Sequence, residues 1–125
     1  MFTVNTVHHL RAHDVVLPHL RSLTKPGGHL ILVDITDPGD WRSLDWHIHE
    51  AFADAEESYR SRSRDSDVAA DVVRLRLHPA WLEHVTTNIP LTTDQLHQQY
   101  EAVFPGVEFA ALHMEVTAAH WRAPS

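Results

Sequence analysis

The chain contains no cysteine and only four glycines, and each shortage excludes a class of site. Without cysteine there are no disulfide bonds, thiolate zinc sites or cysteine nucleophiles. None of the glycines belongs to a GxGxG pattern after a strand, the pattern that lets backbone N–H groups approach a nucleotide at a helix N-terminus. The 125 residues therefore lack the usual glycine-rich element of a nucleotide-binding fold.

Long apolar runs and an excess of basic residues are also missing. No stretch reaches the ~18 consecutive apolar residues of a membrane span, and the first residues are not a basic segment followed by an apolar one. We therefore expect a cytoplasmic protein with no membrane partner. With 17 acidic and 10 basic residues the net charge is −7, which argues against nucleic acid as a partner. Nine of the ten basic residues are arginine, which is typical of GC-rich bacterial coding sequences.

The first 35 residues predict two parallel strands joined by a helix. Residues 2–7 are mostly β-branched or aromatic and predict the first strand, and apolar residues at helical spacing predict a helix over 12–23. A Pro-Gly-Gly turn then leads into residues 30–35, whose nearly unbroken apolar run is typical of a parallel strand buried on both faces.

The rest of the chain predicts helices followed by a β-hairpin. Apolar residues spaced at 44, 48, 51, 52, 55 and 59 indicate an amphipathic helix, and residues 58–67 read as a solvated loop. A second helix is expected over 67–77. Thr92 and Gln95 form a capping box for a further helix that ends at Pro105. An antiparallel strand pair is expected near 107–113 and 115–122.

Two motifs at these positions resemble one family. Val7-His8-His9-Leu10, followed by Lys25-Pro26-Gly27-Gly28-His29-Leu30 and Val33-Asp34, is similar to the fourth strand, next helix and fifth strand of class I S-adenosylmethionine-dependent methyltransferases. Phe104-Pro105-Gly106 and the strands after it resemble the closing hairpin of that fold. The resemblance implies an α/β fold with a partial Rossmann-like methyltransferase sheet, flanked by helices, in the family's strand order 4-5-7-6. It also implies that residues 1–125 form a single partial domain, the C-terminal half of the fold, with 36–92 as a helical insert or lid over the acceptor side.

The resemblance also implies a site at the carboxyl ends of the two parallel strands. S-adenosylmethionine would be the cofactor, with Thr6, Val7 and His8 beside its methionine portion. A small-molecule methyl acceptor would contact side chains that follow the second strand, namely Asp34, Thr36, Asp37, Trp41 and Trp46.

Two of these assignments have structural alternatives. Imidazole titrates near neutral pH, so His8 or His9 could be the catalytic base that takes a proton from the acceptor. Alternatively, His9 packs at the strand end and His8 bonds the backbone. Trp41 and Trp46 would either line the acceptor pocket or pack in the core or lid.

The twelve histidines do not predict a metal site. His47 and His49 are two residues apart, which places them on different faces of a helix. His9 and His13 have a suitable spacing, but a helix is expected to begin between them. Because no HExxH or 2-His-1-carboxylate pattern occurs, we predict no metal.

The missing glycine-rich motif leaves two functions open. In the first, the chain is a truncated or split small-molecule methyltransferase that is inactive alone and binds no cofactor in isolation. In the second, it is a non-enzymatic remnant or interaction module that pairs with a cofactor-binding partner. In both, residues 2–7 form a sheet edge, so we expect a homo-oligomer such as a dimer, or a complex with a separate cofactor-binding polypeptide.

Overall fold

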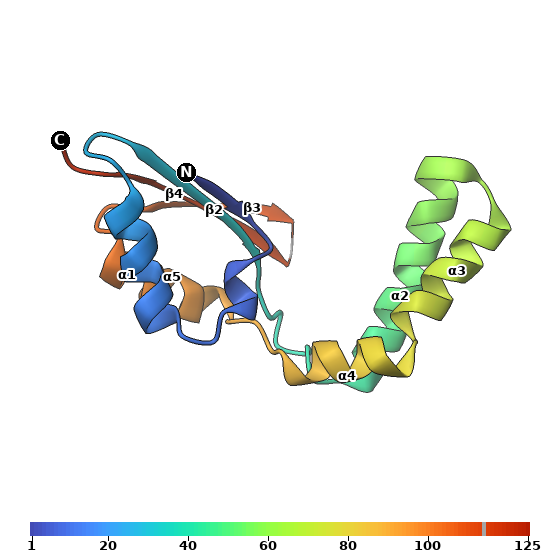
Figure 1. The fold of residues 1–125 in the computed structure, drawn as a ribbon. Coiled ribbons are helices and arrows are strands. Elements are labelled where there is room, and N and C mark those ends of the chain that lie inside the picture. Colours follow the sequence, from blue (N-terminus) through green and yellow to red (C-terminus); the bar gives the residue numbers. More distant parts are fainter. Residues whose placement is uncertain (114) are drawn as a thin grey trace. The chain divides into compact units, whose positions relative to one another are not determined.

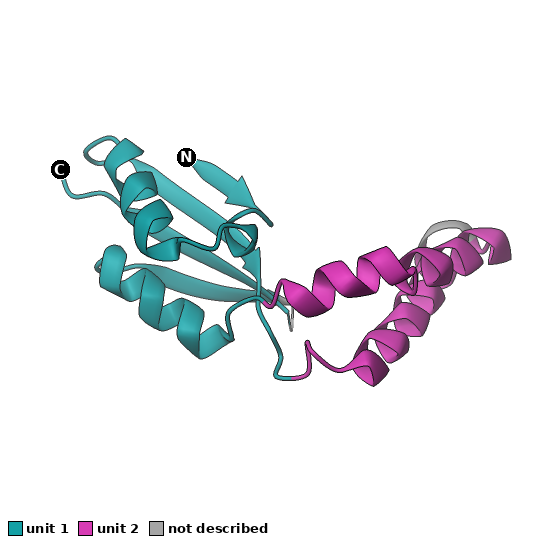
Figure 2. Cartoon of the chain, turned by 60° about the horizontal axis from the view of Figure 1, so that its bottom comes forward, with its two compact units in different colours: residues 1–39, 90–125 teal, residues 40–89 magenta. Residues whose placement is uncertain are grey.

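A computed structural model of the chain describes residues 1–113 and 115–125 (Figure 1). The described residues form five α-helices and a four-stranded mixed sheet, so the expected α/β class is confirmed. They divide into two compact units, which Figure 2 shows in different colours. Residues 1–39 and 90–125 form a unit that contains the sheet, and residues 40–89 form a helical unit. A helical insert was expected over 36–92, and the helical unit of the structure spans 40–89. The role of this segment as a lid stays a prediction.

The sheet combines parallel and antiparallel pairs in the order β1-β2-β4-β3. β1 (Phe2–Val4) runs parallel to β2 (His29–Ile35), and β4 (Val116–Arg122) is antiparallel to both β2 and β3 (Glu108–His113). Two early parallel strands and a C-terminal antiparallel hairpin are therefore present. Their finer identity as four particular strands of a methyltransferase sheet stays a prediction.

The predicted first strand, 2–7, is wrong beyond Val4. Asn5 has a positive φ of 48°, a conformation that Asn tolerates better than most residues, and Val7–His9 form a short 3-10 helix, η1. The Thr6 hydroxyl donates to the Val4 carbonyl at 2.8 Å, and the His8 N–H donates to the Asp34 carboxylate at 2.8 Å. These contacts turn the chain toward the end of β2 instead of extending β1.

Two helices cover one face of the sheet and build the core with it (Figure 1). α1 (His13–Leu23) joins β1 to β2, and α5 (Thr93–Val103) precedes β3. α5 begins with the predicted capping box, in which Thr92 and Gln95 each bond the other's backbone N–H. The core consists of buried side chains from both helices and from the inner face of the sheet: Val7, Leu17, Leu30, Leu32, Leu96, Tyr100, Phe104, Ala119, Trp121 and Ala123.

The helical unit contains α2 (Leu44–Ser58), a π-helical turn, η2 (Tyr59–Ser63), α3 (Ser66–Arg76) and α4 (Pro79–Thr87). The loop predicted over 58–67 was therefore wrong except at 64 and 65, because 58–63 and 66–67 are helical. The predicted inward face of α2 was also wrong in part, because Leu44, Phe52 and Tyr59 are exposed. The buried residues of α2 are His47, Ala51 and Ala55, two of them small, and α2 packs against α3.

Candidate functional site

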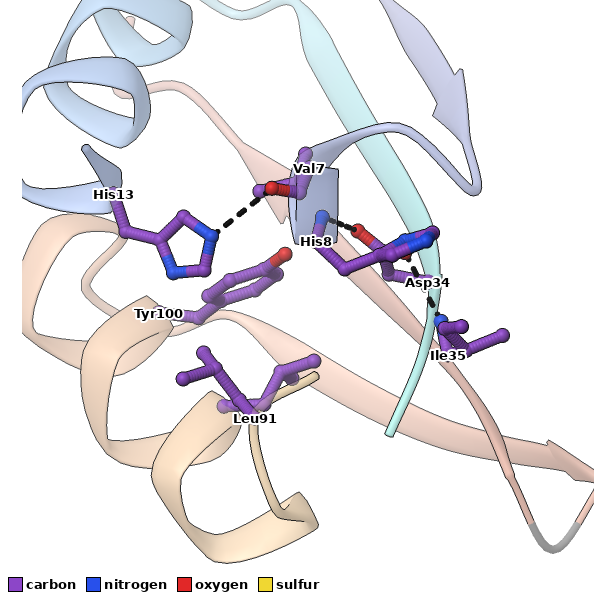
Figure 3. Close-up of a pocket in the computed structure, with 8 residues that line it drawn as sticks. Val7, His8, His13, Asp34, Ile35, Leu91 and Tyr100 are labelled. Atoms are coloured by element: carbon purple, nitrogen blue, oxygen red, sulfur yellow. Dashed lines mark hydrogen bonds and ion pairs between the residues drawn. The ribbon is translucent and has the colours of Figure 1, made fainter. Parts of the chain in front are cut away.

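The site centres on His8 and Asp34, which come from different elements at the same edge of the sheet. Asp34 is the last residue but one of β2, and η1 follows the end of β1 and carries His8. Because β1 and β2 are parallel, their carboxyl ends meet at this edge, where ligands bind in open α/β sheets. The structure thus brings together two residues that are 26 positions apart (Figure 3).

The Asp34 carboxylate is almost fully buried, with 2% of the residue exposed, and all its observed contacts are with donors. One oxygen accepts from the His8 N–H at 2.8 Å. The other accepts from the Ile35 N–H at 3.0 Å and is hydrogen-bonded to Nδ1 of the His8 ring. Since an ionised carboxylate only accepts, we assign the proton to Nδ1 of His8. In the neutral ring the lone pair then lies on Nε2.

His13 and Tyr100 complete the polar part of the site. Nε2 of His13 donates to the Val7 carbonyl at 3.0 Å, and Nδ1 lies 3.2 Å from the Gln99 side-chain oxygen. His13 thereby ties η1 to α1 and α5. Tyr100 is 2% exposed, and burial, with a smaller effect from the Asp34 charge, raises the pKa of its phenol far above the usual value. In Figure 3 Tyr100 lies between His13 and His8, so a protonated hydroxyl is available there.

A small hollow lies among these side chains. Its volume is about 10 Å³, room for about one water molecule, and its walls also include apolar side chains of Ile35, Leu91 and Leu96. A whole nucleotide cofactor does not fit in it. The Gly27-Gly28 pair offers no cradle either, since it precedes the amino end of β2 and serves the turn there. A Cβ on Gly28 would lie 2.8 Å from the Lys25 carbonyl, and Gly27 has a φ of 69°. The described residues therefore do not fit S-adenosylmethionine by themselves.

The other residues predicted near the cofactor and acceptor have local roles in the sheet unit. The Thr6 side chain bonds the Val4 carbonyl, and Val7 is a core residue, 2% exposed, whose backbone faces the site. Thr36 is buried, and its hydroxyl accepts from that of Thr93 at 3.4 Å. Asp37 accepts from the Gly39 N–H at 2.8 Å, which closes a tight turn after β2. His9 is exposed at the surface, and its ring lies 3.8 Å from the ring of His8.

Trp41 and Trp46 belong to the helical unit and pack with His47 there. The Trp41 indole donates to the Val85 carbonyl at 2.8 Å, and the Trp41 carbonyl accepts from the His47 ring at 2.6 Å. The rings of Trp41 and Trp46 lie 5.4 Å apart. Trp41 is buried, with 8% of its surface exposed, and these contacts within the helical unit account for its burial.

Sequence reasoning missed His13 and Tyr100 as members of the site. Tyr100 belongs to no motif in the sequence, although a buried phenol usually needs a polar partner for its hydroxyl, and that was the available signal. The sequence does not indicate that His13 belongs to the site, because its contacts to Val7 and Gln99 depend on how α1 and α5 pack.

The described residues contain neither a metal site of three ligands nor a membrane-spanning helix. Within residues 1–113 and 115–125, no three His, Asp or Glu side chains gather closely enough to hold a metal ion, and no helix is long and apolar enough to cross a membrane. Neither a family model nor a curated protein sequence matches the chain.

Proposed function

We propose that this chain forms the acceptor side of a small-molecule methyltransferase site, in which His8 is the catalytic base and Asp34 orients it. The observation that supports the proposal is the His8–Asp34 pair at the carboxyl ends of two parallel strands. S-adenosylmethionine as methyl donor rests on the family resemblance. Its glycine-rich loop is not among these 125 residues, so binding of the donor would need residues outside them.

The contacts of Asp34 prepare His8 to accept a proton. Because Asp34 holds the Nδ1 proton and also bonds the His8 backbone, both the tautomer and the position of the ring are fixed. A hydroxyl or amine within hydrogen-bond reach of Nε2 can then give up its proton, an effect typically worth about 10²–10⁴-fold in rate. His13 is a positioning residue, since it bonds the backbone of η1 next to His8.

The structure favours His8 over His9, and this choice is testable. The chain, combined with a polypeptide that supplies the donor-binding residues, is incubated with methyl-labelled S-adenosylmethionine and a small-molecule extract, and labelled products are counted. His8→Gln should lose at least about 99% of the transfer, which corresponds to the lower end of the range for general bases. His9→Gln, a change in the exposed neighbour, should keep most of it. Equal loss in both variants, or none in either, contradicts the assignment of His8.

Calorimetric titration with S-adenosylmethionine separates the enzymatic from the non-enzymatic function. Micromolar binding by the chain alone would show that the donor site is complete without further residues. If wild-type chain neither binds the donor at millimolar concentration nor transfers label, an enzymatic role for the isolated chain is wrong.

A second candidate is an interaction module, and β1 carries it. Met1 and Asn5 bond β2 through the Ile31 N–H and the Val33 carbonyl, so the intervening Phe2 and Val4 direct their N–H groups to the free edge. An exposed strand edge can pair with another chain. We propose that β1 pairs with a second copy of this chain or with a cofactor-binding polypeptide.

Sedimentation over a dilution series tests this pairing. Wild-type chain should form a dimer that dissociates on dilution. Val4→Pro removes an outward N–H that β2 does not use, and proline is tolerated on edge strands, so this variant should be monomeric with an unchanged circular dichroism spectrum. Val4→Ala is the control and should still dimerise. A wild-type monomer at every concentration rules out pairing with a second copy.

A further inference from the structure

Two histidines meet on the sheet face opposite α1 and α5, away from the site at His8. Along β2 and β4 the buried residues, such as Leu30 and Trp121, alternate with outward ones, and His29 and His120 are outward. In the register of β2 with β4, His120 lies opposite Ile31, so His29 and His120 are diagonal neighbours on one face.

The two imidazole rings face each other at close range. Nδ1 of His29 lies 2.9 Å from Nε2 of His120, and the ring planes differ by only 7°. Glu108 on β3 pairs directly with His120 in the sheet register, and its carboxylate oxygen lies 3.7 Å from Nδ1 of His120. The carboxylate favours a proton on this Nδ1, which leaves the lone pair of His120 on Nε2, the nitrogen that faces His29.

We propose that His29 and His120 together bind one divalent transition-metal ion, with Cu²⁺ and Ni²⁺ preferred over Zn²⁺. Two imidazole nitrogens that meet on one sheet face, with the Glu108 carboxylate behind one of them, carry the proposal, and their separation is compatible with two ligands of one ion. Two metal–nitrogen bonds of about 2.0–2.1 Å at a right angle place their nitrogens about 2.9 Å apart, whereas a tetrahedral angle needs about 3.3–3.4 Å. Right-angled nitrogen ligands are characteristic of tetragonal Cu²⁺ and Ni²⁺ sites.

Little has to move for the metal to enter. Nδ1 of His29 and Nε2 of His120 share one proton. When this proton moves to Nε2 of His29, the lone pair of Nδ1 becomes available, and Nδ1 can bind the metal as well. Both rings then turn so that their lone pairs converge beside the present hydrogen bond. Water supplies the other ligands at this exposed surface, and Glu108 orients His120 from behind as an outer-shell partner.

The proposal is independent of the methyltransferase proposal and departs from the prediction of no metal. His29 is the first residue of β2 and Asp34 the sixth, so the two sites occupy opposite ends of this strand. The spacing of 91 residues between the two histidines gives no signal in the sequence, because only the sheet register brings them together.

The test is a titration of tag-free protein with CuCl₂, NiCl₂ and ZnCl₂, read by calorimetry and, for Cu²⁺, by electron paramagnetic resonance. Wild-type chain should bind one ion with two coupled imidazole nitrogens. His29→Asn and His120→Asn should each weaken binding at least tenfold and leave one coupled nitrogen. Glu108→Gln should weaken it by about tenfold, at the lower end of outer-shell effects.

The matched control is His19→Asn, which removes an exposed histidine of α1 and should leave affinity and spectrum unchanged. Circular dichroism verifies that each variant is folded, as expected for changes at the surface. If both His29→Asn and His120→Asn bind Cu²⁺ and Ni²⁺ like wild-type chain, the bound metal comes from other histidines. The pair is then only a hydrogen bond, and the proposal is wrong. Tighter binding of Zn²⁺ than of Cu²⁺ at this pair would overturn the right-angled geometry.

Discussion

Replacing the Asp34 carboxylate by an amide should destabilise the sheet unit strongly, because three donors depend on it. The carboxylate accepts from the His8 ring, the His8 N–H and the Ile35 N–H. In Asp34→Asn one acceptor oxygen becomes an NH₂ group of nearly the same size. Whichever oxygen is replaced, at least one buried donor then faces another donor.

The size of the effect follows from these contacts. A buried donor without a partner costs about 1–3 kcal/mol, and a hydrogen bond to a charged group contributes about 1.5–3 kcal/mol. We therefore expect Asp34→Asn to lower the free energy of unfolding by about 2–4 kcal/mol, a large part of the roughly 5–15 kcal/mol that holds a typical protein folded. With a urea slope of about 2 kcal/mol per molar, in the middle of the usual range, the midpoint should fall by roughly 1–2 M.

Urea denaturation followed by circular dichroism measures this effect, and Asp37→Asn is the matched control. Asp37 accepts from the Gly39 N–H in a turn that an asparagine carbonyl can also close, so the control should lose less than about 1 kcal/mol. If Asp34→Asn and Asp37→Asn have the same midpoint, the Asp34 carboxylate does not hold η1, and the orienting role assigned to it for His8 is wrong.

Three further predictions concern other buried or strained positions. Above pH 10 an unfolded tyrosine loses its proton while Tyr100, with its raised pKa, keeps it, so each further pH unit should lower the free energy of unfolding by up to about 1.4 kcal/mol. Urea midpoints between pH 9 and 11 should show this loss in wild-type chain and Tyr59→Phe but not in Tyr100→Phe. Phe104 has no exposed surface, and Phe104→Ala should lower the free energy of unfolding by about 3–5 kcal/mol in the same assay. Phe52 is 58% exposed, and Phe52→Ala should lower it by less than about 1 kcal/mol. Asn5→Val should cost about 1–2 kcal/mol because φ is positive there, whereas Asn5→Gly should cost almost nothing; equal effects would contradict the turn after β1.

Elements that depend on local signals could be predicted from the sequence. The strand over 30–35 and the Thr92–Gln95 capping box were confirmed because strand propensity and helix capping act within a few residues. The expected burial of this strand on both faces was wrong, because buried residues of β2 alternate with more exposed ones. η1 was missed because its cause is not local. The residues after Val4 favour a strand by composition, and the bond from His8 to Asp34 outweighs that preference.

The face that a helix buries was harder to predict than the helix itself. The apolar stripe of α2 that contains Leu44 and Phe52 has a clear helical period, yet these side chains are exposed. Periodicity identifies apolar residues on one side of a helix, but it does not tell which neighbour will pack there. Of this stripe α2 buries only Ala51 and Ala55, two small residues that a measure of side-chain hydrophobicity ranks low.

The candidate site shows the same division between what spacing reveals and what only packing decides. The parallel strands were enough to predict that His8 and Asp34 lie at one edge of the sheet. The bond between them requires β1 to end at Val4, so that η1 can turn the His8 ring and backbone toward Asp34. A strand continued through Val7, as predicted, would have kept His8 in line with β1. The early end of β1 therefore converts two neighbouring polar residues into a pair with a defined tautomer, and it is the structural basis for assigning the base to His8 and not to His9.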